Sequence, residues 1–517
     1  MVTGAPSSTT GGVFPLSGES LKRTCPMTEE FRLEDAGIGT PRRLLQLGIM
    51  IDMKQLRENP ARFALGAKAK GVTVDIESLI ALDAEKRDIT MEREKLRSEQ
   101  NRIAKESGPQ IGKLQGQLKG AHGADREAVE RQIEELKSKP QQLKHAIQEL
   151  EGKEADLQAR ITTLLLQVPL PPDPDVPVGT SSDDNVEIRR WNPSWFDVSK
   201  SFKENKGFEP RTHIELLAHN KLADFERGVK LSGSRSYILT GDGMRLHQAV
   251  LRYAMDRMTE QHGFMPMSVP TIVREETMVG TGFFPAGREQ AYHIEEVKRG
   301  GGYDLFLTGT GEVGLMGIHM DEILDESMLP LKYVTVSTCY RREAGAAGKD
   351  TAGLYRIHQF DKVEQVVICK ADEGESRRWH KQMILFVEEL LQSLEIPHRL
   401  LQCCTGDLGV KNADMVDVES WMPGRGEVVN GKPTGAYGET HSASRLYDFQ
   451  CRRLNMRYRQ GGAEGKGETT FCHSLNNTVL ASPRVLIPLI EMWQNADGSI
   501  TIPPALRPYM GGRERIG

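Results

Sequence analysis

Apolar residues recur every seven positions in two stretches near the start of the chain. The first series is Leu82, Ile89, Leu96 and Ile103, and the second is Val129, Leu136, Leu143, Leu150, Leu157 and Leu164. This spacing places the side chains along one seam of a helix, which must be buried against another helix. The pattern therefore predicts two long helices that pack on each other.

The residues between the two series predict the turn of a helical hairpin. They include Ser107-Gly-Pro109 and then four spaced glycines, Gly112, Gly116, Gly120 and Gly123. Glycine and proline commonly interrupt helices, so we expect the tip here. Helices joined by a short tip run antiparallel, and at about 1.5 Å per residue the shorter one would reach roughly 40–50 Å.

The returning helix contains a second series with the same seven-residue spacing. Its apolar members are Ile133, Ile147 and Ile161, and the positions between them are occupied by Pro140 and Glu154. Pro140 is expected to kink this helix or to mark a local irregularity, because proline lacks the backbone N–H that a helix uses.

The chain changes character after residue 167. Residues 168–186 are rich in Pro, Asp and Ser, which is typical of a linker. Beyond them, short β-rich runs such as 333–337 and 363–368 alternate with helical stretches such as 246–260 and 377–394. We therefore expect an N-terminal helical arm at 50–167, a linker at 168–186 and one α+β domain at 187–517.

Residues 1–49 have no apolar segment after a basic one, so they do not read as a secretory signal. The acidic residues Glu19, Glu29, Glu30 and Asp35 argue against a transit peptide. We expect either a disordered extension or a chain whose true start is Met50.

Composition excludes several classes of protein. The 517 residues correspond to about three domains, and no apolar run approaches the ~18 residues of a membrane span. Seven cysteines without C-x-x-C spacing indicate a reducing compartment rather than a disulfide framework. The adjacent Cys403 and Cys404 are expected to fill a strand, and the 13 histidines show no metal-ligand spacing, so no structural metal site is predicted.

The predicted arm is basic near its tip although the chain as a whole is acidic. Residues 86–119 hold nine Lys or Arg and five Asp or Glu, a charge of +4 in a chain of −5. This bias fits either a solvated coiled-coil face or contact with a phosphate backbone, and charge alone leaves both open.

Two C-terminal segments carry candidate chemistry. In residues 338–364 a strand ends in arginines, a Gly/Ala-rich loop follows, and a second strand returns with Phe360 and Glu364. An arginine here could bind a phosphate, and the Phe360 ring could stack on a planar base. Taken alone, such a hairpin is also compatible with a surface feature that binds no ligand. The direction of the Glu364 side chain stays open. In residues 475–491, Asn476, Thr478 and Arg484 begin an apolar run of helical character. An arginine at a helix start needs an anionic partner, either a ligand or a carboxylate.

Together with the proline-ended strand predicted at 267–270, these segments resemble the three signature motifs of class II aminoacyl-tRNA synthetases, and in detail those of seryl-tRNA synthetases. The matching stretches are 341–351 and 358–364 for motif 2, Thr310-Gly-Glu-Val313 for the serine loop, 439–444 with 448–455 for the nucleotide and metal segment, and the tail 502–512. The resemblance runs from Met50 to about Gly512.

The resemblance implies an antiparallel-sheet catalytic domain and a set of roles. Arg341 would hold the α-phosphate and the serine carboxylate, and Arg484 the γ-phosphate of a bent ATP. Glu343, Ile357 and Phe360 would take adenine. Mg²⁺ would be bound by Glu439 and Ser442. The serine α-amino group would go to Thr310 and Glu312, and its hydroxyl to Glu364 and Thr478 beside Asn476. The adjoining Gly311, Arg342, Thr440 and His441 are counted with the site.

Three motifs depart from the family pattern. The usual T-A-E is Thr310-Gly-Glu312, and the usual E-x-S-S-C-S-N-C is Glu439-Thr-His-Ser-Ala-Ser-Arg-Leu446, which differs at His441, Ala443, Arg445 and Leu446. The usual L-N-G-[ST]-G is Leu475-Asn-Asn-Thr-Val479, which loses two glycines and their backbone freedom. The ligand side chains remain, so we expect a divergent but working member.

The implied function is ATP-dependent activation of L-serine and its transfer to tRNA(Ser), with tRNA(Sec) left open. The arm would grip the long variable arm of the tRNA by shape. A cytoplasmic homodimer without membrane contact is expected. A specialised paralogue, a carrier-protein ligase and a non-catalytic tRNA-binding scaffold are the alternatives; the arm argues against the carrier-protein ligase, and the retained Arg341 and Arg484 argue against the scaffold.

Overall fold

The structure is a computed structural model that describes residues 51–517 except 121, 346–349, 430 and 462–466. The extension predicted at 1–49 lies outside the described residues. Within the described part, no helix has the length and apolarity needed to cross a membrane.

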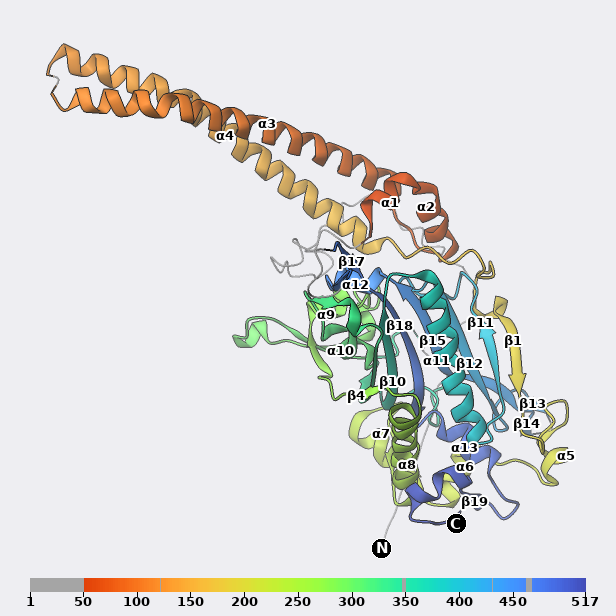
Figure 1. Ribbon diagram of the computed structural model, residues 1–517. Helices are drawn as coiled ribbons and strands as arrows, with labels where there is room; N and C mark the ends of the chain where they lie inside the picture. The colour runs from red at the N-terminus through yellow and green to blue at the C-terminus, as the bar shows by residue number, and fades with distance from the viewer. Residues whose placement is uncertain (1–50, 121, 346–349, 430, 462–466) are drawn as a thin grey trace, which may run out of the picture. The chain divides into compact units, whose positions relative to one another are not determined.

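The N-terminal region is helical, as the seven-residue spacing predicts (Figure 1). Its helices are α1 (Met53–Glu58), α2 (Pro60–Ala69), α3 (Ile76–Leu118) and α4 (Ala124–Gln167). The two long helices α3 and α4 lie side by side and antiparallel, and their seam buries residues of both heptad series, such as Leu82, Leu150 and Leu157. The coiled-coil prediction is confirmed.

The turn of the hairpin occupies only the last part of the predicted tip, around Gly120 and Gly123. Helix α3 continues through Ser107-Gly-Pro109 and ends at Leu118, so the turn lies at 119–123. An internal proline costs a helix about 3 kcal/mol, but further apolar residues continue the seam beyond it, the half-buried Ile111, Leu114 and Leu118. With 43 residues, α3 reaches about 65 Å, more than predicted.

Both polar positions of the returning helix contact α3. Helix α4 runs without interruption through Pro140, whose carbonyl accepts from Gln100 Nε2 at 3.4 Å. Glu154 accepts from Thr90 Oγ1 at 2.9 Å and from Arg93 Nη1 at 2.5 Å. The polar interruptions of the seam are therefore contacts between the two helices.

The C-terminal region is built on one eight-stranded sheet, in the order β1-β11-β12-β15-β18-β10-β9-β4. Its strands are β1 (Val186–Trp191), β11 (His398–Gln402), β12 (Asp414–Met422), β15 (Ala436–Tyr447), β18 (His473–Ser482), β10 (Gln359–Cys369), β9 (Leu331–Tyr340) and β4 (Met265–Pro266). All neighbours are antiparallel except β4 and β9. The predicted antiparallel α+β fold is confirmed.

Shorter elements surround this sheet. The small strands are β2 (Ala223–Asp224), β3 (Ile238–Leu239), β5 (Ile272–Arg274), β6 (Tyr292–Ile294), β7 (Leu305–Leu307), β8 (Ile323–Asp325), β13 (Val428–Val429), β14 (Lys432–Pro433), β16 (Arg457–Arg459), β17 (Thr469–Phe471), β19 (Ile500–Thr501) and β20 (Arg515–Ile516). The helices are α5 (Phe202–Lys206), α6 (His213–His219), α7 (Phe225–Ser232), α8 (Asp242–Asp256), α9 (Glu275–Gly280), α10 (Glu312–Gly317), α11 (Glu373–Ser393), α12 (Phe449–Arg453) and α13 (Leu486–Met492).

Two sequence assignments need correction. Asn476 and Thr478 lie on strand β18 and do not begin a helical run; the helix α13 starts only at Leu486. Pairing of this segment with both β10 and β15 outweighs its apolar periodicity. The strand predicted at 267–270 is also displaced, because only Met265–Pro266 pairs with β9.

Helices α8 and α11 cover one face of the sheet (Figure 1). The paired residues Gln365 and Asn477 both donate to the Met383 carbonyl of α11, at 3.2 and 3.0 Å. Because side chains alternate along a strand, their neighbours Glu364 and Thr478 point to the opposite face. That opposite face carries the candidate site.

Candidate active site

A pocket lies on the open face of the sheet, over β10, β15 and β18. Eight residues of the predicted site line it: Arg341, Glu343, Ile357, Phe360, Glu439, Thr440, Thr478 and Arg484. The remaining lining residues are Leu354, Tyr355, Lys362 and Ala481. Segments that are far apart in the sequence thus meet at one cavity with both apolar walls and arginines.

Each of the two predicted arginines is placed against an aromatic ring. The Arg341 guanidinium lies 5.4 Å from the centre of the Phe360 ring, and that of Arg484 lies 4.6 Å from the centre of the Tyr355 ring. Arg484 also donates to the carbonyls of Tyr355 and Glu439, both at 3.2 Å, while the Glu439 carboxylate is 3.7 Å away. These contacts hold the guanidiniums in place and leave both cations on the pocket wall.

The adenine-side residues are also held in place. Arg356 Nη1 donates to the Glu343 carboxylate at 3.2 Å. Glu343 has a φ of 51°, a left-handed conformation that costs a non-glycine residue about 1 kcal/mol or more. Such strain is concentrated at functional sites, and here it falls on a pocket residue.

A buried polar cluster continues below the pocket. Glu364 is fully buried, and its carboxylate accepts from Asn476 Nδ2 at 2.9 Å and lies 2.5 Å from Lys362 Nζ. Thr478 Oγ1 is 3.5 Å from the same carboxylate. The strand alternation puts Phe360, Lys362 and Glu364 on one face of β10, which settles the direction of Glu364.

The serine loop joins this cluster. Glu312, at the start of α10, is 2% exposed and accepts from Lys411 Nζ at 2.5 Å and Gln450 Nε2 at 2.7 Å. A Cβ on Gly311 would lie 3.4 Å from the Glu364 Cβ, so the loop packs directly on β10. Burial lowers the pKa of Lys411, and the charges of Glu312 and Glu364 oppose this effect.

Three residues of the cluster were not assigned from sequence: Lys362, Lys411 and Gln450. Lys362 alternates with Phe360 and Glu364 along the motif 2 strand, so the period-two pattern could have found it. Gln450 lies inside the 448–455 segment. Lys411 comes from a loop, and no pattern in the sequence points to it.

Other predicted residues lie off the pocket wall. Arg342 is exposed, and its backbone N–H donates to the Gln290 carbonyl at 3.0 Å. His441 is buried, its Nδ1 is 2.8 Å from Thr440 Oγ1, and burial lowers its pKa to about 3. The buried Thr310 bonds within its own loop, where its hydroxyl accepts from the Glu312 N–H at 3.3 Å.

The two predicted metal ligands lie on one strand, and an acidic residue of the adjacent strand lies beside them. Glu439 and Ser442 lie on β15, and Ser442 pairs in register with Asp417 of β12. Burial raises the pKa of Asp417, and the nearby charge of Glu439 adds to the effect. Carboxylate and hydroxyl oxygens suit Mg²⁺, and Asp417 Oδ1 has no hydrogen-bond partner among the described residues, so this donor set fits the ion.

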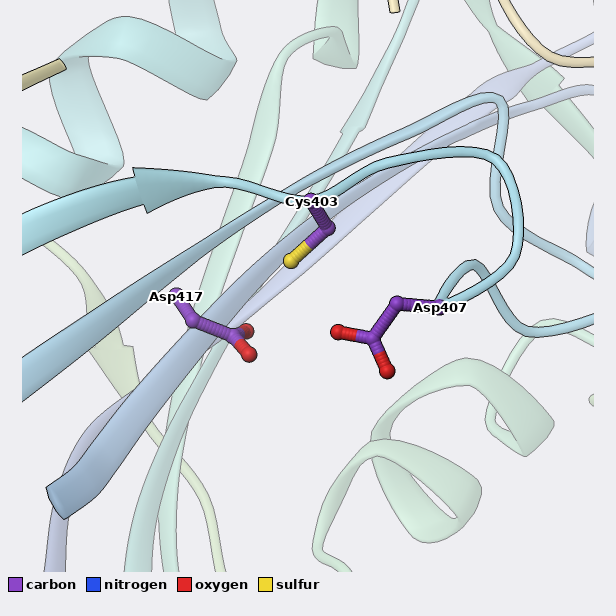
Figure 2. Close-up of side chains that lie close together, drawn as sticks. All are labelled: Cys403, Asp407 and Asp417. Carbon is purple, nitrogen blue, oxygen red and sulfur yellow. The ribbon is translucent and has the colours of Figure 1, made fainter. Parts of the chain in front are cut away.

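Asp417 also belongs to a second group of potential ligands. Figure 2 shows its carboxylate facing Asp407, with the Cys403 thiol directed between them, and the ligand atoms lie within 4.8 Å of one another. Burial raises the pKa of Cys403 and Asp417, which favours protonated, neutral side chains.

Comparison with known proteins agrees with this architecture. Residues 50–171 match the model of the seryl-tRNA synthetase N-terminal domain, and residues 292–493 match that of the class II core domain of the G, H, P, S and T synthetases. The serine–tRNA ligase of Deinococcus radiodurans is 39% identical over 470 residues, which cover 90% of this chain and 99% of the relative. The chain belongs to the seryl-tRNA synthetase family. The family's enzyme from Dictyoglomus turgidum is also 39% identical, over 89% of this chain and 98% of its own length.

Solved structures of the family share the fold. The seryl-tRNA synthetase of Pyrococcus horikoshii, complexed with ATP, is 36% identical and superposes with a TM-score of 0.76 over 90% of this chain and 99% of its own. The cytoplasmic serine–tRNA ligase of Naegleria fowleri, in complex with AMP, is 28% identical with a TM-score of 0.73 over 91% and 98%. The class II architecture implied by the sequence motifs is therefore confirmed.

Proposed function

We propose that the chain activates L-serine with ATP and transfers the seryl group to tRNA(Ser). The observation that carries this proposal is the convergence of Arg341, Glu364, Thr478 and Arg484, from three separate segments, on one pocket and the cluster beneath it. The family's ATP-bound and AMP-bound structures support a nucleotide substrate.

The pocket binds the nucleotide. Adenine enters between Phe360 and the wall that contains Glu343 and Ile357. Arg341 and Arg484 bind the α- and γ-phosphates, because fixed guanidiniums match phosphate oxygens and are charged at every relevant pH. Glu439 and Ser442 would hold Mg²⁺, which would supply positive charge to neutralise the phosphates.

The buried cluster binds serine. The substrate hydroxyl lies between Glu364 and Thr478, and the α-amino group faces Thr310 and Glu312. An amino acid without the hydroxyl would forgo hydrogen bonds to these buried polar groups, at a cost of about 1–3 kcal/mol. Discrimination against alanine therefore follows from burial of the cluster.

The reaction needs positioning more than proton transfer. The serine carboxylate is already an anion, so its attack on the α-phosphorus requires no protein base. Negative charge grows on the phosphoryl oxygens, and the prearranged Arg341 and Arg484 stabilise it. The attack breaks the bond between the α- and β-phosphates and releases pyrophosphate. The seryl group then passes from the adenylate to a ribose hydroxyl at the end of the tRNA, and AMP leaves.

The helical arm, residues 50–167, binds the tRNA. The +4 charge of residues 86–119 lies on the part of the arm toward its tip, most of it on α3. Such a surface binds RNA by backbone and shape rather than by sequence.

The active form is a cytoplasmic homodimer. A hollow of about 510 Å³ between α8 and the sheet edge is lined by Leu251, Met255, Pro266 and Val336 among others. Val336 is 45% exposed, and Met265 beside it is 58% exposed. Exposed apolar side chains around a hollow are typical of a subunit interface, which supports the dimer.

Pyrophosphate exchange tests the proposal directly. Exchange should depend on L-serine, and Arg341→Ala should abolish it without changing the thermal unfolding midpoint. Exchange that proceeds equally with alanine, or without any amino acid, would refute the proposed substrate. Aminoacylation of tRNA(Ser) and tRNA(Sec) transcripts then determines which of them is charged.

A further inference from the structure

The two side chains that hold Glu312 both come from elements that contact the base of the helical arm. We define the arm base as residues 52–70 together with 166–173. Lys411 belongs to the loop 409–413 between β11 and β12, and Gln450 belongs to α12. Each element is bonded to the arm base by separate contacts.

The loop 409–413 is bonded along almost its whole backbone. Lys70, at the end of α2, is 8% exposed, and its Nζ donates to the carbonyls of Gly409 at 2.9 Å and Asn412 at 2.5 Å. Two backbone N–H groups of the arm base donate to further carbonyls of the loop. Leu170 donates to Val410 and Asp173 donates to Ala413, both at 2.8 Å. The arm base thus fixes the loop on both sides of Lys411.

Helix α12 is bonded to the arm base through Arg452 and Arg453, which come two and three residues after Gln450. Arg452 Nη2 lies 3.1 Å from Asp52, the residue that caps α1. Arg453, 2% exposed, donates to the Leu166 carbonyl at 3.3 Å. Gln450 itself is fully buried and also donates to the Thr281 carbonyl at 2.9 Å.

We propose that the arm base positions the serine pocket: Lys70 and Arg453 are positioning residues that, through Lys411 and Gln450, set the orientation of Glu312. This inference rests on the proposed function, in which Glu312 faces the serine α-amino group. Hydrogen bonds between packed elements transmit a displacement directly, because such elements move as units. Loosening the arm base therefore weakens serine binding without touching the nucleotide pocket.

The test is Lys70→Met in the full-length chain, assayed by pyrophosphate exchange without tRNA. Methionine keeps the length of the side chain but cannot bond the two carbonyls. The KM for serine should rise about 3- to 30-fold, the span of typical coupling between linked sites, while the KM for ATP stays within twofold. Lys70→Arg, which can still donate, should recover most of the loss.

The matched control is Lys68→Met, an exposed lysine on the same helix, which should change neither KM. An unchanged serine KM in Lys70→Met, or an equal rise in both KM values, would overturn the inference. If Lys70→Met does not fold, Asp52→Asn decides in its place, because asparagine can still cap α1 but loses the charge that pairs with Arg452. Absence of serine-dependent exchange in the unmodified chain would instead refute the proposed function, so the two failures are distinguishable.

Discussion

Replacing Asp173 by asparagine should destabilise the chain strongly, because Asp173 neutralises a buried arginine. Its carboxylate accepts from Arg445 Nε at 3.0 Å and again from Arg445 Nη2, and Tyr447 and Arg377 contact the same group at 3.0 and 3.1 Å. Arg445 is 2% exposed, and its other carboxylate partner is Asp414, 2.8 Å from Nη2. Arginine is foreign to the family pattern at this position.

The expected size of the effect follows from this burial. Removing one partner of a buried ion pair costs about 3–5 kcal/mol when the other charge is left uncompensated. Because Asp414 still faces Arg445, we expect the lower end of this range, about 3 kcal/mol. Asp173→Asn should lower the free energy of unfolding by that amount, measured as a shift of the urea midpoint by circular dichroism. Asp175→Asn is the matched control: Asp175 pairs with Arg377 at 2.8 Å on the surface and should cost less than about 1 kcal/mol.

A double-mutant cycle separates the pair from general disruption. Asp173→Leu combined with Arg445→Met removes both charges, so the double variant should lose at least about 2 kcal/mol less than the sum of the two single losses. A loss below 1 kcal/mol for Asp173→Asn, or additive effects in the cycle, would contradict the reasoning.

Three further predictions concern the site, the arm and acid stability. Glu364→Gln should reduce kcat/KM for serine about 100-fold with the KM for ATP within a few fold, since only the serine cluster loses its charge; equal losses for both substrates would contradict this. Converting the exposed Lys105, Lys113 and Lys119 to glutamate should raise the KM for tRNA at least about tenfold and flatten its salt dependence, with pyrophosphate exchange unchanged. The pKa of His441 is lowered from 6.5 to about 3 in the folded chain. Below pH 6.5 the imidazole is therefore protonated in the unfolded chain but still neutral in the folded chain, so the free energy of unfolding falls as the pH drops from 6.5 toward 3. Between pH 7 and pH 5 this group should cost about 2 kcal/mol, and the cost should be absent from the urea midpoints of His441→Ser.

The sequence predicted the arm well except at its tip, for a physical reason. The heptads fix which residues face the partner helix, so the seam from Leu82 onward follows from spacing alone. Helix termination depends on a balance between local cost and packing. The apolar residues after Pro109 continue the seam in a shifted register, and their burial outweighs the proline, which a strict seven-residue count does not reveal.

The site was predictable where motifs lie on regular strands. Phe360 and Glu364 share a face of β10 by simple alternation, and Arg341 ends the strand paired with it. Lys411 was not predictable, because it reaches Glu312 only after the loop 409–413 has been bonded by residues more than 200 positions away. Hydrogen bonds between residues so far apart in the chain leave no local pattern in the sequence.

The two glycine replacements in motif 3, Asn477 and Val479, leave the ligand side chains in place because of where they lie on β18. Neither Asn477 nor Val479 adopts a positive φ, so both positions are extended backbone that any residue can take. Asn477 turns its amide to the α11 carbonyl of Met383, and Val479 is buried in the core, so both extra side chains leave the open face of the sheet free. The intervening Thr478 keeps its place beside Glu364 because alternation along β18 forces it to the other side. Substitutions on the helix-facing side of this strand are therefore absorbed by the core, and only changes at the positions between them should alter serine recognition.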